Sequence, residues 1–387
     1  MPQGSVSHIT SPAERDRRYA ALRGAMSGQG LEALVICSRG DEFVRGRVQY
    51  VSDIFQWAGR GFVVLPAKGD AVFVGDPLWG LGYAMLGGYL EDYRLPERAG
   101  TEIGSILGDL GLSKASVGVV GLADITAVAD YNDMTAAQPN VDWQDATDLF
   151  DDVRMIKSEE EIEATKETGR ILRAVFSALE AEIRPGVREL DVLAEAHRLA
   201  RQLGCVEGIA LMGTAPFRSF TPGTDGVIGK DDVMVVDLEW GGPSGYWVEL
   251  RRVYSFKPPT DVQQKFWETR VESFAACIDA MKAGEPSQNI AAARDKVYAK
   301  YGQSAEGVLA YTAHGIGVDS LEPPWVPGKD RIMQEGMMIN LHPAIKFDDP
   351  EVGAALGGIS IADNGVVRAS GGERVTDEVD RWIVLDS

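Results

Sequence analysis

The stretch VVDLEWGGPSGYWVELRRV, residues 235–253, decides the fold class of the second half of the chain. Its two flanks are rich in β-branched and aromatic residues, and GGPSG at 241–245 separates them. Glycine and proline clustered in this way favour a tight turn, so the stretch predicts a β-hairpin.

Acidic side chains lie at alternate positions of this predicted hairpin. Successive side chains of a strand point to opposite faces, which puts Asp237 and Glu239 on one face of the first strand. The same rule puts Glu249 and Arg251 on one face of the second strand, together with Trp247. Burying an unpaired carboxylate is costly, so this face is either solvated or part of a functional site.

The segments on both sides of the hairpin predict an α+β domain. Ser158 and Glu161 form a capping-box pattern that opens a long helix, which ends before Pro185. Further helices are predicted at 189–203, 261–283 and 290–301, and further strands at 336–345 and 357–367. Because helices and strands come in blocks and do not alternate strictly, they favour an antiparallel sheet over a doubly wound parallel one.

The first part of the chain predicts a separate α/β domain. A helix at 13–28 leads into a buried strand at 31–37. Strands at 61–66, 71–75 and 117–121 and a helix at 102–110 follow. We therefore expect one domain over residues 1–152 and a second over residues 153–387.

Composition excludes several classes of protein. The 387 residues carry 38 Lys and Arg against 58 Asp and Glu, a net charge of -20, so nucleic acid and anionic membrane surfaces are not expected partners. No run of about 18 apolar residues predicts a membrane span, and the N-terminus lacks the apolar run of a signal peptide. Cys37, Cys205 and Cys277 match no disulfide or zinc spacing. We expect a cytoplasmic protein with a small-molecule substrate.

Histidine is scarce, so any histidine chemistry draws on few positions. The chain has only His8, His197, His314 and His342. His314 lies in AHGIG, where small neighbours allow close approach, and His342 ends the apolar run INLH. A histidine in such a place is either a core residue or a ligand.

The order of these motifs resembles that of one family. MIKSEEEI, VVD with GYWVELRR, HGIG with a downstream EPP, GMMINLHP and GGISIADNGVV follow one another between residues 155 and 367. This order is similar to the creatinase/aminopeptidase P/methionine aminopeptidase (M24) family, and the first domain resembles the creatinase and prolidase N-terminal domain. The resemblance implies a C-terminal pita-bread domain, a creatinase-type N-terminal domain and a homodimer.

The resemblance also implies a metal site whose ligands are altered here. The active peptidases of the family hold two metal ions with two Asp, one His and two Glu. Asp237 and His314 match the first Asp and the His. Glu249 stands at the second Asp position, His342 at the first Glu position and Ala362 at the last Glu position.

The remaining donors favour one metal ion. Glu249, His314 and His342 offer one carboxylate and two imidazoles, which suit a single divalent ion such as Fe, Zn or Mn. Asp237 is a further candidate ligand, and either Asp237 or Glu239 is the expected proton acceptor. In a metal-free alternative, His314 or His342 acts as general base.

These departures predict a non-peptidase member of the family. The proton-transfer histidines of the peptidases match Phe220 and Leu321, so Xaa-Pro cleavage is expected to be lost. The leading prediction is a hydrolase that cleaves a C–N bond in a small carboxylate-bearing molecule. Two alternatives stay open: a mononuclear iron lyase or oxygenase that uses the same residues, and a non-catalytic pita-bread binding protein.

Substrate recognition is expected from one arginine and four tryptophans. The resemblance puts Arg60 where creatinase-like enzymes have an arginine that reaches a substrate carboxylate from the neighbouring subunit, and guanidinium binds carboxylate through two parallel hydrogen bonds. The tryptophans either line an aromatic pocket or belong to the core; they are Trp57, Trp240, Trp247 and Trp325. Arg252 matches the arginine of the family motif and is expected to pair with the acidic cluster.

Overall fold

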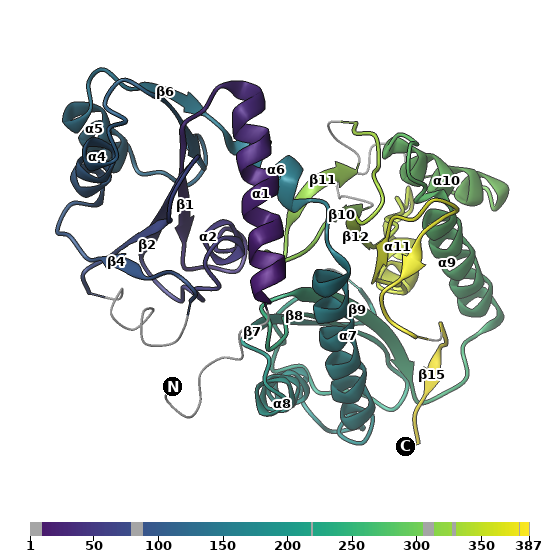
Figure 1. Cartoon of the computed structure of the whole chain (residues 1–387). Coiled ribbons are helices and arrows are strands. Elements are labelled where there is room, and N and C mark those ends of the chain that lie inside the picture. The colour runs from purple at the N-terminus through teal and green to yellow at the C-terminus, as the bar shows by residue number, and fades with distance from the viewer. Residues whose placement is uncertain are drawn as a thin grey trace. The chain divides into compact units, whose positions relative to one another are not determined.

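The computed structural model describes residues 10–78, 88–217, 220–304, 313–326, 330–378 and 380–386 (Figure 1). The chain divides into two compact units, Met1–Arg154 and Met155–Ser387. Of the four histidines, His8 lies outside the described residues.

The first unit combines a mixed sheet with several helices. Its strands are β1 (Ala33–Arg39), β2 (Arg60–Pro66), β3 (Val72–Gly75), β4 (Asp92–Arg94), β5 (Ser116–Val120) and β6 (Asp142–Asp145). Its helices are α1 (Pro12–Gln29), α2 (Gly46–Tyr50), α4 (Ala99–Asp109), α5 (Val128–Ala137) and α6 (Thr147–Arg154). The six strands form one sheet in the order β4-β3-β2-β1-β5-β6 (Figure 1).

Strand β1 is central to this sheet and joins its two parts. It pairs antiparallel with β2 and parallel with β5. Val35 and Cys37 of β1 pack in one core cluster with Ile103 and Leu107 of α4. The predicted α/β character of this part of the chain is confirmed. The polar strand β6 was not predicted because its sequence, DWQD, lacks the apolar pattern of a strand.

The second unit contains longer helices and two sheets. Its helices are α7 (Glu159–Leu179), α8 (Glu189–Gln202), α9 (Asp261–Ala280), α10 (Gln288–Lys300) and α11 (Pro350–Leu356). Its strands are β7 (Glu207–Thr214), β8 (Val233–Gly241), β9 (Trp247–Ser255), β10 (Ala313–Gly315), β11 (Glu322–Val326), β12 (Met338–Leu341), β13 (Asp363–Val366), β14 (Glu373–Arg374) and β15 (Ile383–Val384). One sheet has the order β11-β10-β12-β13-β14, and the other has the order β15-β9-β8-β7.

Helix α7 begins as predicted at a capping box. Ser158 Oγ accepts a hydrogen bond from the Glu161 backbone N–H at 3.2 Å, and Glu161 Oε2 accepts one from the Ser158 backbone N–H at 2.9 Å. These bonds satisfy backbone donors that the first turn of a helix leaves without partners. Helices α7 and α8 both pack against the sheet that contains β8 (Figure 1).

The predicted hairpin is formed by β8 and β9, and its two faces differ. Val236, Leu238 and Trp240 belong to a core cluster with apolar residues of α7 and α8. Strand alternation turns Asp237 and Glu239 to the opposite face. The packing of α7 and α8 therefore fixes which face of the hairpin carries the acidic residues.

The edge of β9 also connects the two sheets. The Arg251 backbone N–H donates to the Ala362 carbonyl at 3.2 Å, and Asn364 Nδ2 donates to the Glu249 carbonyl at 3.0 Å. Residues 249–251 therefore lie where the two sheets meet, and side chains from both sheets converge there.

Two predicted strands are shorter than expected. Strand β12 ends at Leu341 and not at 345, because Pro343 follows and proline cannot donate a ladder hydrogen bond. The second strand covers only Asp363–Val366 of the predicted range 357–367. The short helix α11 was not predicted, although Asp349 caps it by accepting a hydrogen bond from the Glu351 backbone N–H at 2.8 Å.

Two observations bear on the predicted class of protein. No helix in the described part of the chain has the length and apolar character needed to cross a membrane. Cys37, Cys205 and Cys277 are all buried and carry free thiols.

Candidate functional site

The pairing of β8 with β9 brings three acidic side chains and one arginine onto one face of the hairpin. Asp237 lies directly opposite Arg251, and Glu239 lies directly opposite Glu249. Directly opposite residues share a face, with Cβ atoms about 4.5–5.5 Å apart. Asp237 and Glu249 are buried, and Glu239 and Arg251 are partly buried. The sequence prediction that these four side chains share a face is confirmed. The prediction that Trp247 shares this face is wrong, because Trp247 packs in the core cluster with residues of α7 and α8.

Arg251 is the ionic partner of this acidic face. Its Nη2 donates to Asp237 Oδ2 at 2.5 Å and to Glu249 Oε1 at 2.9 Å. Its Nη1 donates to Ser360 Oγ at 3.2 Å, and its guanidinium carbon lies 4.7 Å from the centre of the Phe220 ring. Contacts on three sides therefore hold the guanidinium in one place.

Arg252 does not take this role, so the prediction that it pairs with the acidic cluster is wrong. Its guanidinium lies 2.8 Å from Glu378 and 3.1 Å from Glu180. Because Arg252 follows Arg251 by one residue in β9, its side chain leaves the strand from the opposite face.

His314 is buried in β10 with a defined tautomer. Its Nδ1 lies 2.9 Å from the Gly315 carbonyl oxygen, which only accepts hydrogen bonds, so Nδ1 carries the proton. The lone pair of the imidazole is therefore on Nε2. Asn340 of β12 lies directly opposite His314, and its Nδ2 donates to His314 Nε2 at 3.2 Å and to Glu249 Oε2.

His342 completes a group of three nitrogen and oxygen donors. It directly follows β12, and its ring centre lies 5.1 Å from that of His314. Glu249, His314 and His342 each offer one ligand atom, and these atoms all lie within 4.8 Å of one another. The structure thus brings together the three predicted metal ligands, which come from three separate segments.

Both imidazoles of this group are neutral at ordinary pH. Burial lowers the pKa of His314 to about 4. Burial, with a contribution from the nearby His314 and Arg251, lowers the pKa of His342 to about 3. A metal ion binds the neutral imidazole, so no proton competes for these donors near pH 7.

The two carboxyl groups of β8 have raised pKa values. Burial raises the pKa of Asp237 to about 7, while Arg251 opposes the rise and Glu249 adds to it. Burial and the facing Glu249 also raise the pKa of Glu239 well above its usual range. Ser320 Oγ donates a hydrogen bond to Glu239 Oε1. Asp237, with a pKa of about 7, is therefore suited to exchange protons near neutral pH.

One divalent ion fits the donors that the structure provides. Two neutral imidazoles and one carboxylate suit a transition ion and leave coordination positions for water or substrate. The Gly315 carbonyl orients His314, as an outer partner of a metal-bound histidine does. Within the described ranges, Glu249, His314 and His342 form the one group of this kind.

A second ion does not fit. Asp237 and Glu249, which would hold it, both bind Arg251. Ala362 offers only a methyl group at the position that the resemblance assigns to a ligand. The neighbouring Asp363 is already occupied, because its Oδ2 accepts hydrogen bonds from Arg374 and Thr376. The dinuclear arrangement of the active peptidases is therefore not supported by these side chains.

The predicted substrate tryptophans lie in different environments. Trp325 of β11 pairs with His314, and its ring centre lies 6.2 Å from the imidazole centre. Trp240 and Trp247 are buried in the hydrophobic core beneath α7 and α8. Trp325 is thus near a candidate metal ligand, His314, whereas Trp240 contacts His197, which lies outside the group.

The other two predicted substrate residues belong to the first unit. Trp57 is 40% exposed. Arg60 Nε donates to Asp130 Oδ2 at 2.8 Å, while 46% of the Arg60 side chain remains exposed. The Arg60 guanidinium thus has an acidic partner within its own unit.

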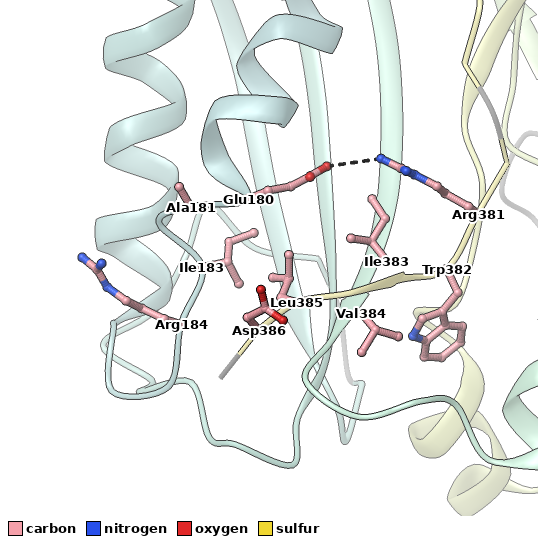
Figure 2. A pocket seen from close by; sticks show the side chains of 10 residues that line it. All are labelled: Glu180, Ala181, Ile183, Arg184, Arg381, Trp382, Ile383, Val384, Leu385 and Asp386. Carbon is pink, nitrogen blue, oxygen red and sulfur yellow. Dashed lines mark ion pairs between the residues drawn. The ribbon is translucent and has the colours of Figure 1, made fainter.

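Two cavities of the second unit differ in their relation to this site. A cavity of about 610 Å³ is lined by residues that follow α7 and by the C-terminal segment, with Glu180 and Arg381 3.9 Å apart (Figure 2). None of the three metal-ligand candidates lines it. A smaller cavity of about 390 Å³ is lined by Phe217, Phe220 and glycines of 353–358, and Phe220 also contacts Arg251. The smaller, apolar cavity is the one that adjoins the acidic face.

Three polar side chains of the site were not predicted from the sequence. Asn340 contacts both Glu249 and His314, Ser320 contacts Glu239, and Ser360 contacts Arg251. Asn340 had a usable signal, because it stands two residues before His342 in the same apolar run. Ser320 and Ser360 lie outside strands and had no periodic signal.

Two protein families match the chain. Residues 163–369 match the Metallopeptidase family M24. Residues 18–156 match the Creatinase/Prolidase N-terminal domain.

Named relatives and solved structures agree with these matches. The Xaa-Pro dipeptidase of Pyrococcus furiosus is 25% identical over 267 residues, which cover 67% of this chain and 73% of the relative. The "Probable dipeptidase PepE" of Mycobacterium bovis is 30% identical over 207 residues, and the match covers 52% of this chain and 55% of that relative. The structure of an Xaa-Pro dipeptidase from Bacillus anthracis has a TM-score of 0.79 at 20% identity, with 95% and 99% of the chains covered, and supports the fold.

The prediction of a non-peptidase member is wrong, because the relatives are named as dipeptidases. These relatives also do not favour the lyase, oxygenase or binding-protein alternatives. The prediction gave too much weight to Phe220, Leu321 and Ala362. In general, a single metal ion can activate water and polarise a carbonyl, so altered residues at a second metal position do not by themselves exclude peptide hydrolysis.

The predicted fold is confirmed, with a creatinase-type N-terminal domain followed by a C-terminal pita-bread domain. The broad prediction of a hydrolase is also confirmed. The family match covers more than half of the chain, and the chain belongs to the Metallopeptidase family M24.

Proposed function

We propose that the chain is a dipeptidase that hydrolyses the peptide bond of a short peptide at one divalent metal ion. The observation that carries this proposal is the group formed by Glu249, His314 and His342, whose ligand atoms lie within 4.8 Å of one another. The M24 family match and the dipeptidase names of the relatives support the reaction class.

Glu249, His314 and His342 would hold the ion, which when bound would activate a water and polarise the carbonyl of the scissile bond. The protein residues fix the geometry: the Gly315 carbonyl sets the tautomer of His314, and Asn340 holds Glu249 beside Nε2 of His314.

Asp237 and Glu239 are the proposed proton carriers. Asp237 Oδ1 is buried without a hydrogen-bond partner, and we assign it to accept the proton of the attacking water. Glu239, whose pKa is raised by burial and by the facing Glu249, is assigned to donate a proton to the leaving amine. Ser320 orients this carboxyl through its hydrogen bond to Oε1.

Arg60 is the proposed reader of the substrate carboxylate, acting from the neighbouring subunit of a homodimer. Its bond to Asp130 uses Nε, and its side chain is 46% exposed, which leaves the Nη atoms accessible to a carboxylate. Trp325, near His314, and the exposed Trp57 are proposed to contact the substrate. Trp240 and Trp247 are proposed to act only indirectly, as core residues.

Domain limits and location complete the proposal. We propose domains over 1–152 and 153–387, supported by the nearby division of the structure after Arg154. A cytoplasmic location is supported by three buried cysteines with free thiols.

A metal-dependence assay tests the function. Protein purified without an affinity tag is stripped with a chelator, reloaded with Mn²⁺, Co²⁺ or Zn²⁺, and assayed with Ala-Pro, Leu-Pro and Ala-Ala. We expect ion-dependent release of free amino acids, and weaker cleavage of the same dipeptides with an amidated C-terminus. His197→Ala is the matched control, because His197 lies outside the group and contacts Trp240. Full activity after stripping, or no cleavage with any ion, would contradict the proposal.

A further inference from the structure

Arg251 lies between two carboxylates that come from neighbouring strands. A single nitrogen, Nη2, donates to both Asp237 Oδ2 and Glu249 Oε1. Asp237 and Glu249 thus approach the guanidinium nitrogen in the way that two carboxylate ligands approach one metal ion. Here the cation belongs to the protein, and its charge does not depend on pH in the ordinary range.

The guanidinium is held too firmly to move aside. Nη1 donates to Ser360 Oγ, the Phe220 ring packs against the guanidinium, and the Arg251 backbone N–H donates to the Ala362 carbonyl. Only 12% of the Arg251 side chain is exposed. Moving it away would leave Asp237 buried without a partner, which is costly.

The two oxygens of Glu249 have different partners. Oε1 binds Arg251, and Oε2 accepts a hydrogen bond from Asn340, whose amide also reaches His314 Nε2. Glu249 therefore has one oxygen on the side of the guanidinium and one on the side of the imidazoles. It links the position of Arg251 to the position of the metal-binding group.

The charges of the acidic face also favour this arrangement. Three carboxyl groups, Asp237, Glu239 and Glu249, share the face, and Glu239 lies directly opposite Glu249. Like charges directly opposite destabilise a sheet. Arg251 already supplies positive charge to the two of these groups that it contacts, Asp237 and Glu249, so this part of the face has its cation without a second ion.

We propose that Arg251 is a built-in cation that takes the place of a second metal ion, so that this site binds one divalent ion per chain. This rests on the proposed function only in that Glu249, His314 and His342 hold the one ion. Arg251 is thus a positioning residue: it fixes Asp237 and Glu249, and it need not touch the substrate.

Metal stoichiometry tests the inference without any substrate. Chelator-stripped protein is titrated with Mn²⁺ by equilibrium dialysis and elemental analysis, and its electron paramagnetic resonance spectrum is recorded. For wild type we expect a plateau at one ion per chain and the spectrum of an isolated Mn²⁺. In Arg251→Gln, Asp237 and Glu249 lose their cation, and we expect a second, weaker binding step together with a spin-coupled signal.

Two further variants make the test specific. Arg251→Lys keeps the positive charge and is expected to keep one ion. Arg252→Gln is the matched control: it removes the neighbouring guanidinium, which pairs with Glu378 and Glu180, and is expected to keep one ion.

The possible results distinguish a failure of the one-ion inference from a failure of the proposed function. A wild-type plateau at two ions, or a coupled signal in wild type, overturns the inference and leaves a metallopeptidase. A plateau at one ion in Arg251→Gln also overturns it. A wild-type plateau at zero overturns both the inference and the proposed function. If circular dichroism shows that Arg251→Gln is unfolded, the number of ions bound by wild type and its spectrum test the inference alone.

Discussion

The two sides of Glu249 carry different groups, a charged guanidinium on one side and neutral imidazoles on the other. On one side, a guanidinium binds Oε1 and is fixed by Ser360 and Phe220. On the other side, His314 and His342 present neutral imidazoles, which can accept an external ion. A guanidinium supplies positive charge but cannot coordinate water or substrate. Neutral nitrogen donors supply no charge themselves, but they can bind a metal ion that does. The difference shows how a two-ion site can become a one-ion site without loss of its fold.

The largest expected effect comes from breaking the imidazole side. His342→Ala removes one of three ligands, so the affinity for Mn²⁺ or Zn²⁺ should fall by more than about 100-fold, since outer partners of a ligand alone account for about 10–100-fold. Dipeptide cleavage should disappear with it. Equilibrium dialysis against the metal measures the affinity. Unchanged metal binding would remove His342 from the site, and His197→Ala serves as the control that should bind like wild type.

The guanidinium side is tested by the pH dependence of stability. The pKa of Asp237 is raised from 3.8 to about 7 in the folded protein, so the folded state holds a proton that the unfolded state releases between these values. The free energy of unfolding of the metal-free protein should therefore fall as pH rises from about 4 to 7, by on the order of 1 kcal/mol per pH unit.

Urea titrations at several pH values compare wild type with Asp237→Asn, which cannot titrate at this position. The slope should be reduced in Asp237→Asn and retained in the control Asp348→Asn, whose side chain is 94% exposed. Equal slopes in wild type and Asp237→Asn would contradict the assigned environment of Asp237.

Arg60 belongs to neither side of Glu249, so its variant tests substrate binding separately from metal binding. Arg60→Ala should weaken binding of a dipeptide with a free C-terminal carboxylate by about 1.5–3 kcal/mol, the range for charged hydrogen bonds, because the carboxylate loses its guanidinium. Metal affinity should not change. Inhibition constants of product-like ligands, with and without a carboxylate, measure the effect. Equal affinity of both proteins for the carboxylate ligand would show that Arg60 does not read it.

The smallest expected effect concerns the amide that joins the two sides. Asn340→Ala removes the hydrogen bonds to Glu249 and His314 but keeps all three ligands. Metal affinity should fall by about tenfold, the lower end for an outer partner of a ligand. Asn289→Ala is a matched control, because Asn289 bonds to Glu285 on an exposed surface. A loss as large as that of His342→Ala would mean that Asn340 is itself a ligand.

Local sequence patterns predicted much of the fold. The alternation around 235–253 gave the hairpin and its acidic face, and Ser158 with Glu161 gave the start of α7. These features depend on neighbours in sequence. The short strand at 363–366 was less predictable, because its pairing with the distant strand β12 decides its length.

The candidate site was predictable in its ligands and not in its partners. Glu249, His314 and His342 were found from motif order, and the structure brings them together. The pairing of Arg251, and not Arg252, with the acids follows from strand parity, which the motif comparison did not apply. The contacts of Asn340 and Ser360 depend on how the two sheets meet, and no local pattern contains that information.

A crystal of the protein soaked in Mn²⁺, measured at the manganese absorption edge, tests the central claim most directly. The account predicts one anomalous peak per chain, bounded by Glu249, His314 and His342, with the Arg251 guanidinium still bound to Asp237. No peak beside the two imidazoles, or a second peak between Asp237 and Glu249, would contradict it.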